Sequence, residues 1–323
     1  MSSPEYIIFL AIGVVLVISG LIFNGFIVFV MISQLTKCRS LASSEQLFLS
    51  LGLSNLWATI VLGLLHFDFS PASDFSSFNF EIWYSFFFFS IIVRYWLTAL
   101  LCFFYCIKIV NSSHAFFLWC KLRISWLIPR LLVGSLIISL FALIVTLSTM
   151  HIPAQESPAG NTTSANTTTV NQRKSLKGSF KKFDLMFSAF GSGCPFLVVL
   201  LCSILVVASL CEHVCQITSK DSHLRSFQAK AHIQATRTVL SLLLLFISFF
   251  VVQTLSMTVD IGYNGTLFIL TVMTIYSPAQ AVILVLNNPK LKQALAVMVQ
   301  RTVLICEDQS GCNGSPSFVV YFI

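Results

Sequence analysis

Charged side chains are scarce in this sequence. Lysine, arginine, aspartate and glutamate together make up 10% of the 323 residues, whereas hydrophobic residues make up 56%. Soluble domains have about 25% and about 45–50% of these two groups, so a water-soluble fold could not cover this much apolar surface. Apolar runs of about 20 residues recur along the whole chain, which predicts a polytopic helical membrane protein that forms one bundle.

The sequence also lacks the patterns that enzymes and metal sites use. It contains no phosphate-binding loop, no H-E-x-x-H motif, no nucleophile elbow and no paired carboxylates in apolar sequence. Cys211 and Cys215 flank His213, but this spacing matches no standard metal site. We therefore expect no catalytic residue, metal or cofactor. The net charge of +7 does not indicate nucleic-acid binding, because the basic residues cluster in short loops between apolar runs.

The apolar runs predict seven membrane helices. Unlike a secretory signal peptide, the first run is preceded by Glu5 and by no basic residue. The loop after it carries Lys37 and Arg39 and no acid, which marks the cytoplasmic side. The sequence thus predicts an all-α seven-transmembrane helix bundle with an extracellular N-terminus and a cytoplasmic tail at 287–323. The expected helices lie at about residues 6–32, 45–66, 82–109, 126–150, 183–210, 235–257 and 266–286.

A long polar segment at 151–182 is predicted to be the second extracellular loop. It contains two N-glycosylation sequons, at Asn161 and Asn166, which are usable only on the luminal side. Five basic residues between 173 and 182 favour the opposite side, but the segments placed in the cytoplasm hold about twelve. None of the ten cysteines falls in a predicted extracellular loop, so we expect no disulfide framework.

The first and third helices each carry an unusual polar residue. Asn24 needs a partner in hydrocarbon, and we expect that partner on the second or seventh helix. Gly20 and Gly25 beside it allow a neighbouring helix to approach closely. Arg94 is a full charge inside the third helix, so it faces the bundle interior or a wet cavity. Three readings stay open for Arg94: a polar or anionic ligand, an outward snorkel, or a partner in an acidic loop, namely Asp68, Asp74 or Asp260.

The stretch from Trp96 to Ile124 reads W-L-T-A-L-L-C-F-F-Y-C-I-K-I-V-N-S-S-H-A-F-F-L-W-C-K-L-R-I. It resembles the third transmembrane helix and second intracellular loop of type 2 taste (bitter) receptors, which are seven-helix G-protein-coupled receptors. Three further segments resemble the same family: V-V-A-S-L-C-E-H, A-H-I-Q-A-T-R-T-V-L-S-L-L-L-L-F and S-P-A-Q-A-V-I-L-V-L-N-N-P-K-L-K-Q-A-L. The resemblance implies a multi-pass plasma-membrane receptor without a disulfide at the top of the third helix.

The chain departs from the family pattern at three places. Asn55 stands where the family often has an arginine in the second helix. Ile91 and Ile92 replace an Asn-His pair that is associated with agonist contact. In the seventh helix, Ala279-Gln280-Ala281 replaces a His-Ser pair. These positions belong to an inter-helix network, a ligand anchor and a switch, so each can alter how this chain responds.

The resemblance implies a receptor for small, often amphipathic bitter compounds that activates a heterotrimeric G protein of the gustducin or inhibitory class. The ligand cavity is expected among helices three, five, six and seven. The expected ligand-binding residues are Phe87, Ile91, Arg94, Tyr95 and Phe246. The expected G-protein-coupling residues are Tyr105, Lys108, His114, Ser209 and His232.

Two alternatives stay open at this point, a vomeronasal-type pheromone receptor and a small-molecule transporter. Transporters usually show internal repeats and several midplane charges, and this sequence shows neither. The segment from Leu291 to Val303 is expected to be an interfacial helix on membrane lipid at the inner leaflet. The sequence leaves open whether the receptor pairs as a homodimer or heterodimer.

Overall fold

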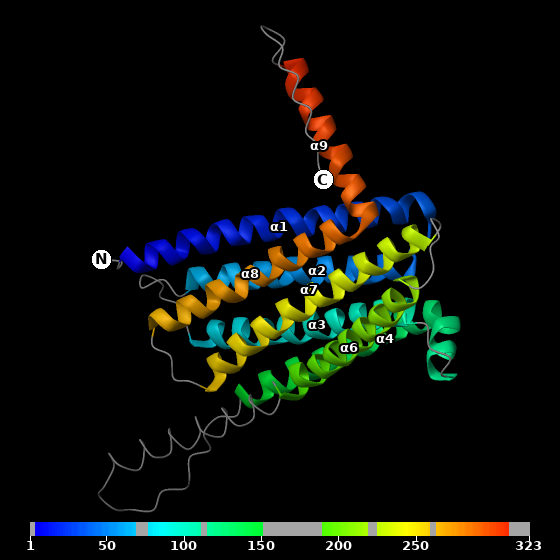
Figure 1. The fold of residues 1–323 in the computed structure, drawn as a ribbon. Helices are drawn as coiled ribbons and strands as arrows, with labels where there is room; N and C mark the ends of the chain where they lie inside the picture. The colour runs from blue at the N-terminus through cyan, green and yellow to red at the C-terminus, as the bar shows by residue number, and fades with distance from the viewer. Residues whose placement is uncertain are drawn as a thin grey trace, which may run out of the picture.

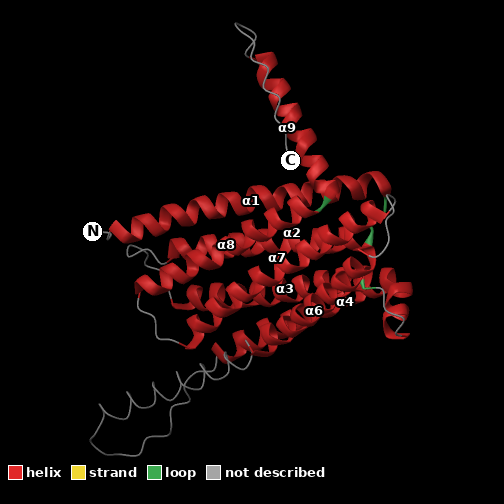
Figure 2. Cartoon of the chain, in the orientation of Figure 1, coloured by secondary structure: helices red, strands yellow, loops and turns green. Residues whose placement is uncertain are grey.

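The computed structural model describes residues 4–68, 77–110, 115–150, 189–218, 225–258 and 263–309, and within these ranges all regular structure is helical (Figures 1 and 2). The elements are α1 (Pro4–Cys38), α2 (Ser43–Asp68), α3 (Ser77–Ile109), α4 (Ala115–Met150), the π-helical turn η1 (Ala189–Gly193), α6 (Cys194–Thr218), α7 (Arg225–Thr258), α8 (Tyr263–Asn287) and α9 (Pro289–Gln309).

Seven of these helices are long and apolar enough to cross a membrane, which confirms the predicted bundle class. Helices suit this role because each satisfies its own backbone hydrogen bonds and leaves none exposed to lipid. Figure 1 shows them running side by side. The spans within the described residues are Ile7–Cys38, Ser43–His66, Ser85–Ile109, Ala115–Ser148, Gly191–Ser209, Thr236–Ser256 and Leu267–Asn287.

Helix α3 forms the centre of the bundle. It contacts α2, α4, α6, α7 and η1, and its span has the largest buried share of the seven. Helices α1 and α4 lie at the periphery, where apolar side chains such as Val15 and Ile144 are exposed. In a membrane protein this pattern is expected, because lipid covers the outer faces. Residues at the middle of α3 therefore meet most of the bundle.

Close packing between α1 and α2 depends on glycine. A Cβ on Gly20 would lie 3.0 Å from Thr59 Oγ1, and a Cβ on Gly52 would lie 2.9 Å from Val28 Cγ2. The expected close approach at Gly20 is confirmed. Gly25 differs, because nothing lies within 4 Å of its Cβ direction. A 3.6-residue period turns Gly25 to a different face of α1 from Gly20.

Helix α4 begins eleven residues before the expected start of its membrane span. Lys121 and Arg123 therefore lie on a helix rather than in a loop. Hydropathy marks where a helix enters the membrane. No proline or glycine interrupts the chain between Ala115 and Pro129, so the helix already begins before the membrane span. The Arg123 guanidinium carbon lies 5.8 Å from the Trp119 ring centroid. This cation–π contact pairs the Arg123 charge with a ring on the same part of α4.

The entry to α6 is irregular. The π-helical turn η1 ends at Gly193, and Pro195 is the second residue of α6. Proline is tolerated in a first helical turn because its missing N–H would be unpaired there anyway. A π-helical turn therefore comes directly before the α-helical turn that contains Pro195. A Cβ on Gly191 would lie 3.1 Å from Ile92 Cδ1, so η1 packs directly on α3.

Helix α9 leaves the bundle crosswise to the other helices (Figure 1). Asn288 caps its start, since Asn288 Oδ1 accepts from the backbone N–H of Lys290 at 2.9 Å. Leu291 is buried against the bundle, whereas Val297 and Met298 are exposed. The helix expected at Leu291 to Val303 lies within α9, and its contact with membrane lipid stays a prediction. We call the end of the bundle at which α9 begins the α9 end.

Candidate functional site

A network of buried polar side chains joins α1, α2 and α8 at mid-bundle. Asn24 Nδ2 donates to the carbonyls of Gly20 at 2.9 Å and Ser277 at 3.2 Å. Asn55 Nδ2 donates to Asn24 Oδ1 at 3.1 Å and to Gln280 Oε1 at 2.9 Å. The expectation that Asn24 bonds to the second or seventh helix is therefore confirmed on both helices. Asn55 Oδ1 is buried without a hydrogen-bond partner.

Gln280 extends this network to the central helix. Its Nε2 donates to Thr98 Oγ1 at 2.7 Å and lies 3.4 Å from Tyr276 Oη. The hydroxyls of Thr98 and Tyr276 are 3.2 Å apart. All three residues are buried. Gln280, which stands in the place of the missing His-Ser pair, thus bridges α2, α3 and α8 with both ends of its amide.

Arg94 lies beside this network and is 3% exposed. Its Nε donates to the Ser90 carbonyl at 3.3 Å, and its Nη1 donates to Ser277 Oγ at 3.3 Å. The guanidinium carbon lies 5.0 Å from the Tyr276 ring centroid. The side chain therefore turns into the bundle rather than snorkelling outward. Of the acids considered as partners, Asp74, Asp260 and the Asp68 side chain lie outside the described residues.

Aromatic rings form a layer next to Arg94. The Tyr95 ring lies 4.4 Å from Phe246 on α7 and 6.2 Å from Tyr276 on α8. Phe249 meets Tyr276 edge-on at 4.7 Å, and Phe196 on α6 lies 6.0 Å from Phe246. The layer therefore connects the central helix with α6, α7 and α8. Such ring pairs add about 0.5–1.5 kcal/mol each beyond the area that they bury.

The five expected ligand residues lie in or near this layer. Tyr95 and Phe246 are brought into direct contact. Ile91 is buried and Phe87 is partly buried, one and two turns from Tyr95 along α3. The sequence did not point to Tyr276 as a site residue, although its ring contacts Arg94, Tyr95 and Phe249. Its position directly before the segment that resembles the family, two residues from Pro278, was the available signal.

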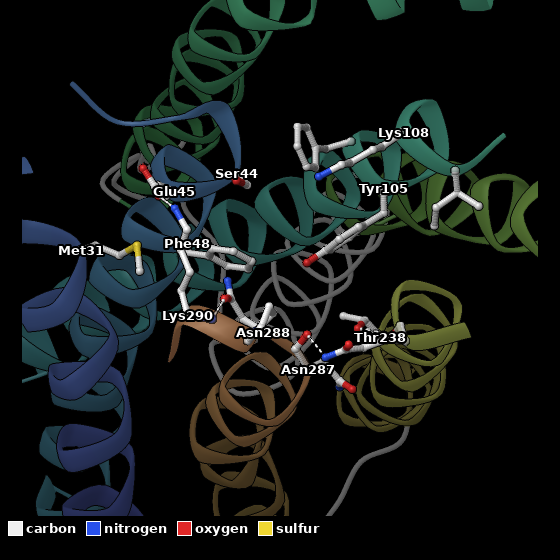
Figure 3. Close-up of a pocket in the computed structure, with 14 residues that line it drawn as sticks. Met31, Ser44, Glu45, Phe48, Tyr105, Lys108, Thr238, Asn287, Asn288 and Lys290 are labelled. Atoms are coloured by element: carbon white, nitrogen blue, oxygen red, sulfur yellow. Dashed lines mark hydrogen bonds and ion pairs between the residues drawn. The ribbon is translucent and has the colours of Figure 1, made fainter. Parts of the chain in front are cut away.

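A cavity of about 360 Å³ opens at the α9 end. Figure 3 shows Tyr105 and Lys108 directed into it from α3, facing Asn288 and Lys290 at the junction of α8 and α9. Lys290 Nζ contacts Glu45 Oε1 at 2.6 Å on one side of the cavity. This is an ion pair between an exposed lysine and a largely buried carboxylate.

A hydrogen bond ties two of the cavity walls together. Gln234 Nε2 on α7 donates to the Asn287 carbonyl on α8 at 2.9 Å. Of the other expected coupling residues, Ser209 is half-buried on α6 and does not line the cavity. His114 and the side chain of His232 lie outside the described residues. The structure therefore brings two of the five expected coupling residues, Tyr105 and Lys108, into the cavity.

Seven membrane-spanning helices around a polar core, with a cavity at one end, are the architecture of a G-protein-coupled receptor. Comparison with known proteins gives the family. The profile of the taste receptor protein (TAS2R) family matches residues 1–303. The chain belongs to this family, and it is a bitter taste receptor of the plasma membrane rather than a pheromone receptor or a transporter. As in its relatives, nothing indicates catalytic activity.

Individual relatives match over most of their length. The chain is 27% identical to human taste receptor type 2 member 2, over 85% of this chain and 90% of the relative. It is 27% identical to member 62 of Pan paniscus, over 97% and 98%. It is 30% identical to member 9 of Papio hamadryas, over 86% and 88%. The matches therefore cover whole receptors rather than one segment.

Proposed function

We propose that this receptor binds small, often amphipathic bitter compounds above the aromatic layer, on the side of the bundle opposite the α9 end. Phe87, Ile91, Arg94, Tyr95 and Phe246 are the proposed contacts. An agonist there would press on rings that belong to α3, α6, α7 and α8 at once. Because only differential affinity shifts a population, the agonist must bind the active arrangement of these rings better than the inactive one.

The cavity at the α9 end is the proposed G-protein site, with the N-terminus outside the cell and α9 in the cytoplasm. Two observations support this orientation: the basic loop with Lys37 and Arg39, and the sequons at Asn161 and Asn166 on the other side of the membrane. Tyr105 and Lys108 would meet the G protein within the cavity, and Ser209, His114 and His232 would meet it around the opening. A gustducin-class or inhibitory-class α subunit is the proposed partner.

The observation that carries the proposal is the contact between Tyr95 and Phe246. It links the central helix to α7, and α7 is also the helix that Gln234 ties to α8 at the cavity. A shift of Phe246 would tilt α7 and strain the bond between Gln234 and Asn287. Release of that bond widens the cavity wall formed by α7. The agonist side and the G-protein side would thus be coupled through one rigid helix.

Calcium release in cells that co-express this chain with a promiscuous G-protein α subunit tests the proposal. A panel of bitter compounds should give a saturable response that mock-transfected cells lack. Lys108→Ala should weaken the response to every agonist without changing surface delivery, while Lys292→Ala on exposed α9 serves as a matched lysine control. An unchanged response of Lys108→Ala would remove the cavity from the coupling site, and silence of the wild type at full surface delivery would contradict the function.

A further inference from the structure

Arg94 is a buried cation whose contacts with the described residues are all neutral. Its partners are a carbonyl, a hydroxyl and the face of a phenol ring. A guanidinium presents five N–H donors, and the two bonds to Ser90 and Ser277 occupy two of them. The structure describes no hydrogen bond for the remaining donors, and the side chain is 3% exposed. This is an unusual environment for a full charge, because an unpaired buried charge costs several kcal/mol.

The membrane spans offer no counter-charge for Arg94. Across the seven spans of the described chain the sequence contains a single carboxylate, Glu45. Glu45 lies at the α9 end and is already engaged by Lys290. Arginine does not lose its proton in proteins, so the charge stays. The positive charge at mid-bundle is therefore not balanced by any side chain within these spans.

The backbone of Asp68, the acid next to the α2 span, lies far along α2 from Arg94. Arg94 Nη1 bonds to Ser277 Oγ, which lies 3.5 Å from the Asn55 carbonyl, so the guanidinium is level with Asn55 on α2. Asp68 is thirteen residues further along α2, which is about 20 Å at 1.5 Å per residue. That separation exceeds the length of an arginine side chain several times.

We propose that the core around Arg94 binds one monovalent anion. The free N–H groups of Arg94 would donate to it, and the Ser277 hydroxyl would add a further donor, since its 3.5 Å contact with Asn55 is at the limit of a hydrogen bond. A charge-assisted bond of this kind is about twice as strong as a neutral one. The anion supplies the negative charge that the seven spans lack.

Two sources can provide this chemistry. One is a free halide, of which chloride is abundant outside cells. The other is the carboxylate of an amphipathic agonist, and this second source rests on the proposed agonist site beside Tyr95 and Phe246. Both place a single negative charge against the same guanidinium. They differ in whether the site is filled before an agonist arrives.

Thermal unfolding of the detergent-purified full chain tests the halide arm without any agonist. At constant ionic strength, replacing gluconate by chloride should raise the Tm of the wild type by about 3 °C for each tenfold increase above the Kd. Arg94→Gln should lose this dependence. In gluconate it should unfold no earlier than the wild type, because the uncompensated charge is gone. Arg130→Gln removes an exposed arginine of α4 and should keep the dependence.

Agonist pairs test the carboxylate arm in the calcium assay. Carboxylate agonists should lose at least tenfold in potency in Arg94→Gln, whereas their methyl esters should not. Arg94→Lys keeps the charge and should retain part of both effects, which separates loss of charge from loss of fold.

Chloride dependence alone assigns the site to a free halide, and ester-selective loss alone assigns it to the agonist. Absence of both in a wild type that unfolds cooperatively, or chloride dependence that survives in Arg94→Gln, overturns the proposal. If no compound activates the wild type, the proposed agonist function fails while the chloride measurement still decides the anion site.

Discussion

Gln280 on α8 donates to Thr98 on α3 at 2.7 Å, and its carbonyl oxygen accepts from Asn55 on α2. One neutral amide thus holds three helices together in the middle of the membrane. The Ala279-Gln280-Ala281 segment stands where the family resemblance implies a His-Ser pair, and the Gln280 amide does not change its charge with pH. The network should therefore be insensitive to pH between about 5 and 8, the range in which histidine titrates.

Removal of this amide should destabilise the receptor. Gln280→Ala removes one of the two bonds of the Asn55 amide and the bond that Thr98 Oγ1 accepts. Hydrogen bonds between membrane helices are worth about 0.6 kcal/mol on average and up to about 1.7. Because two such bonds are lost, we expect a cost of about 1–2 kcal/mol in thermal unfolding. Gln300→Ala on exposed α9 is the control and should unfold like the wild type. Equal stability of the two variants would show that the network contributes nothing.

The contact between α1 and α2 should not tolerate a side chain at Gly52. Its Cβ would lie 2.9 Å from Val28 Cγ2, and overpacking of this kind typically costs about 1–3 kcal/mol. We expect Gly52→Leu to lower the Tm and the surface expression. Gly25→Leu is the matched control, because nothing lies within 4 Å of its Cβ direction. Similar losses in both variants would point to helix insertion rather than packing.

The aromatic layer should respond to loss of its central ring. Phe246 is fully buried, and truncation of a buried phenylalanine to alanine costs about 3–5 kcal/mol. Phe246→Ala should therefore reduce surface expression strongly, whereas Phe246→Tyr keeps the ring and should change agonist potency instead. Phe268→Ala, at a ring that is 55% exposed on α8, should have little effect in the same flow-cytometry assay. Full expression of Phe246→Ala would place the ring outside the packed core.

The ion pair at the cavity should matter less for stability than its short distance suggests. The Lys290 side chain is 62% exposed, and ion pairs open to solvent contribute about 0–1 kcal/mol. Lys290→Ala should lower the unfolding free energy by less than about 1 kcal/mol. The double variant Glu45→Lys, Lys290→Glu reverses the ion pair. If the pair holds α9 against α2, this variant should give the calcium response of the wild type. A larger loss in thermal unfolding, unaffected by salt, would contradict this estimate.

The orientation of the chain can be checked at the two sequons. Asn161→Gln and Asn166→Gln should each remove one glycan, and the double variant should lose both on a denaturing gel. Asn111→Gln, in the short segment between α3 and α4 on the opposite side of the membrane, should leave the glycan pattern unchanged. Unglycosylated protein at the cell surface would contradict the extracellular assignment of residues 151–182.

The sequence was sufficient for the features that depend on local composition. Seven apolar runs predicted seven spans, because hydrocarbon imposes length and apolarity on each helix separately. The partners of Asn24 were also predictable, since a buried amide must find a donor or acceptor on a neighbouring helix. The predicted first residue of α4 was too late in the sequence. Hydropathy shows where a helix enters the membrane and does not show how far the helix extends outside it.

Features that depend on side-chain direction were not predictable. The sequence left a ligand, an outward snorkel and an acidic-loop partner open for Arg94, and the structure turns the side chain toward Ser277 and Tyr276 on α8. Gly25 is a small residue of the first helix like Gly20, so the sequence suggested a close helix contact at both. The helix period turns Gly25 away from the α2 interface. Gln280 looked like the loss of a switch, and its role as a three-helix bridge appears only when α2, α3 and α8 are placed together.

The bundle is unevenly stiff. At mid-membrane several hydrogen bonds join α8 to α2 and to α3, whereas at the α9 end a hydrogen bond from Gln234 to the Asn287 carbonyl links α7 to α8. A single bond of this kind has a net value of about 1 kcal/mol, which is a fivefold change in population. Under the proposed coupling, a compound whose affinities for the two arrangements differ by about this much would be sufficient to open this end of the receptor.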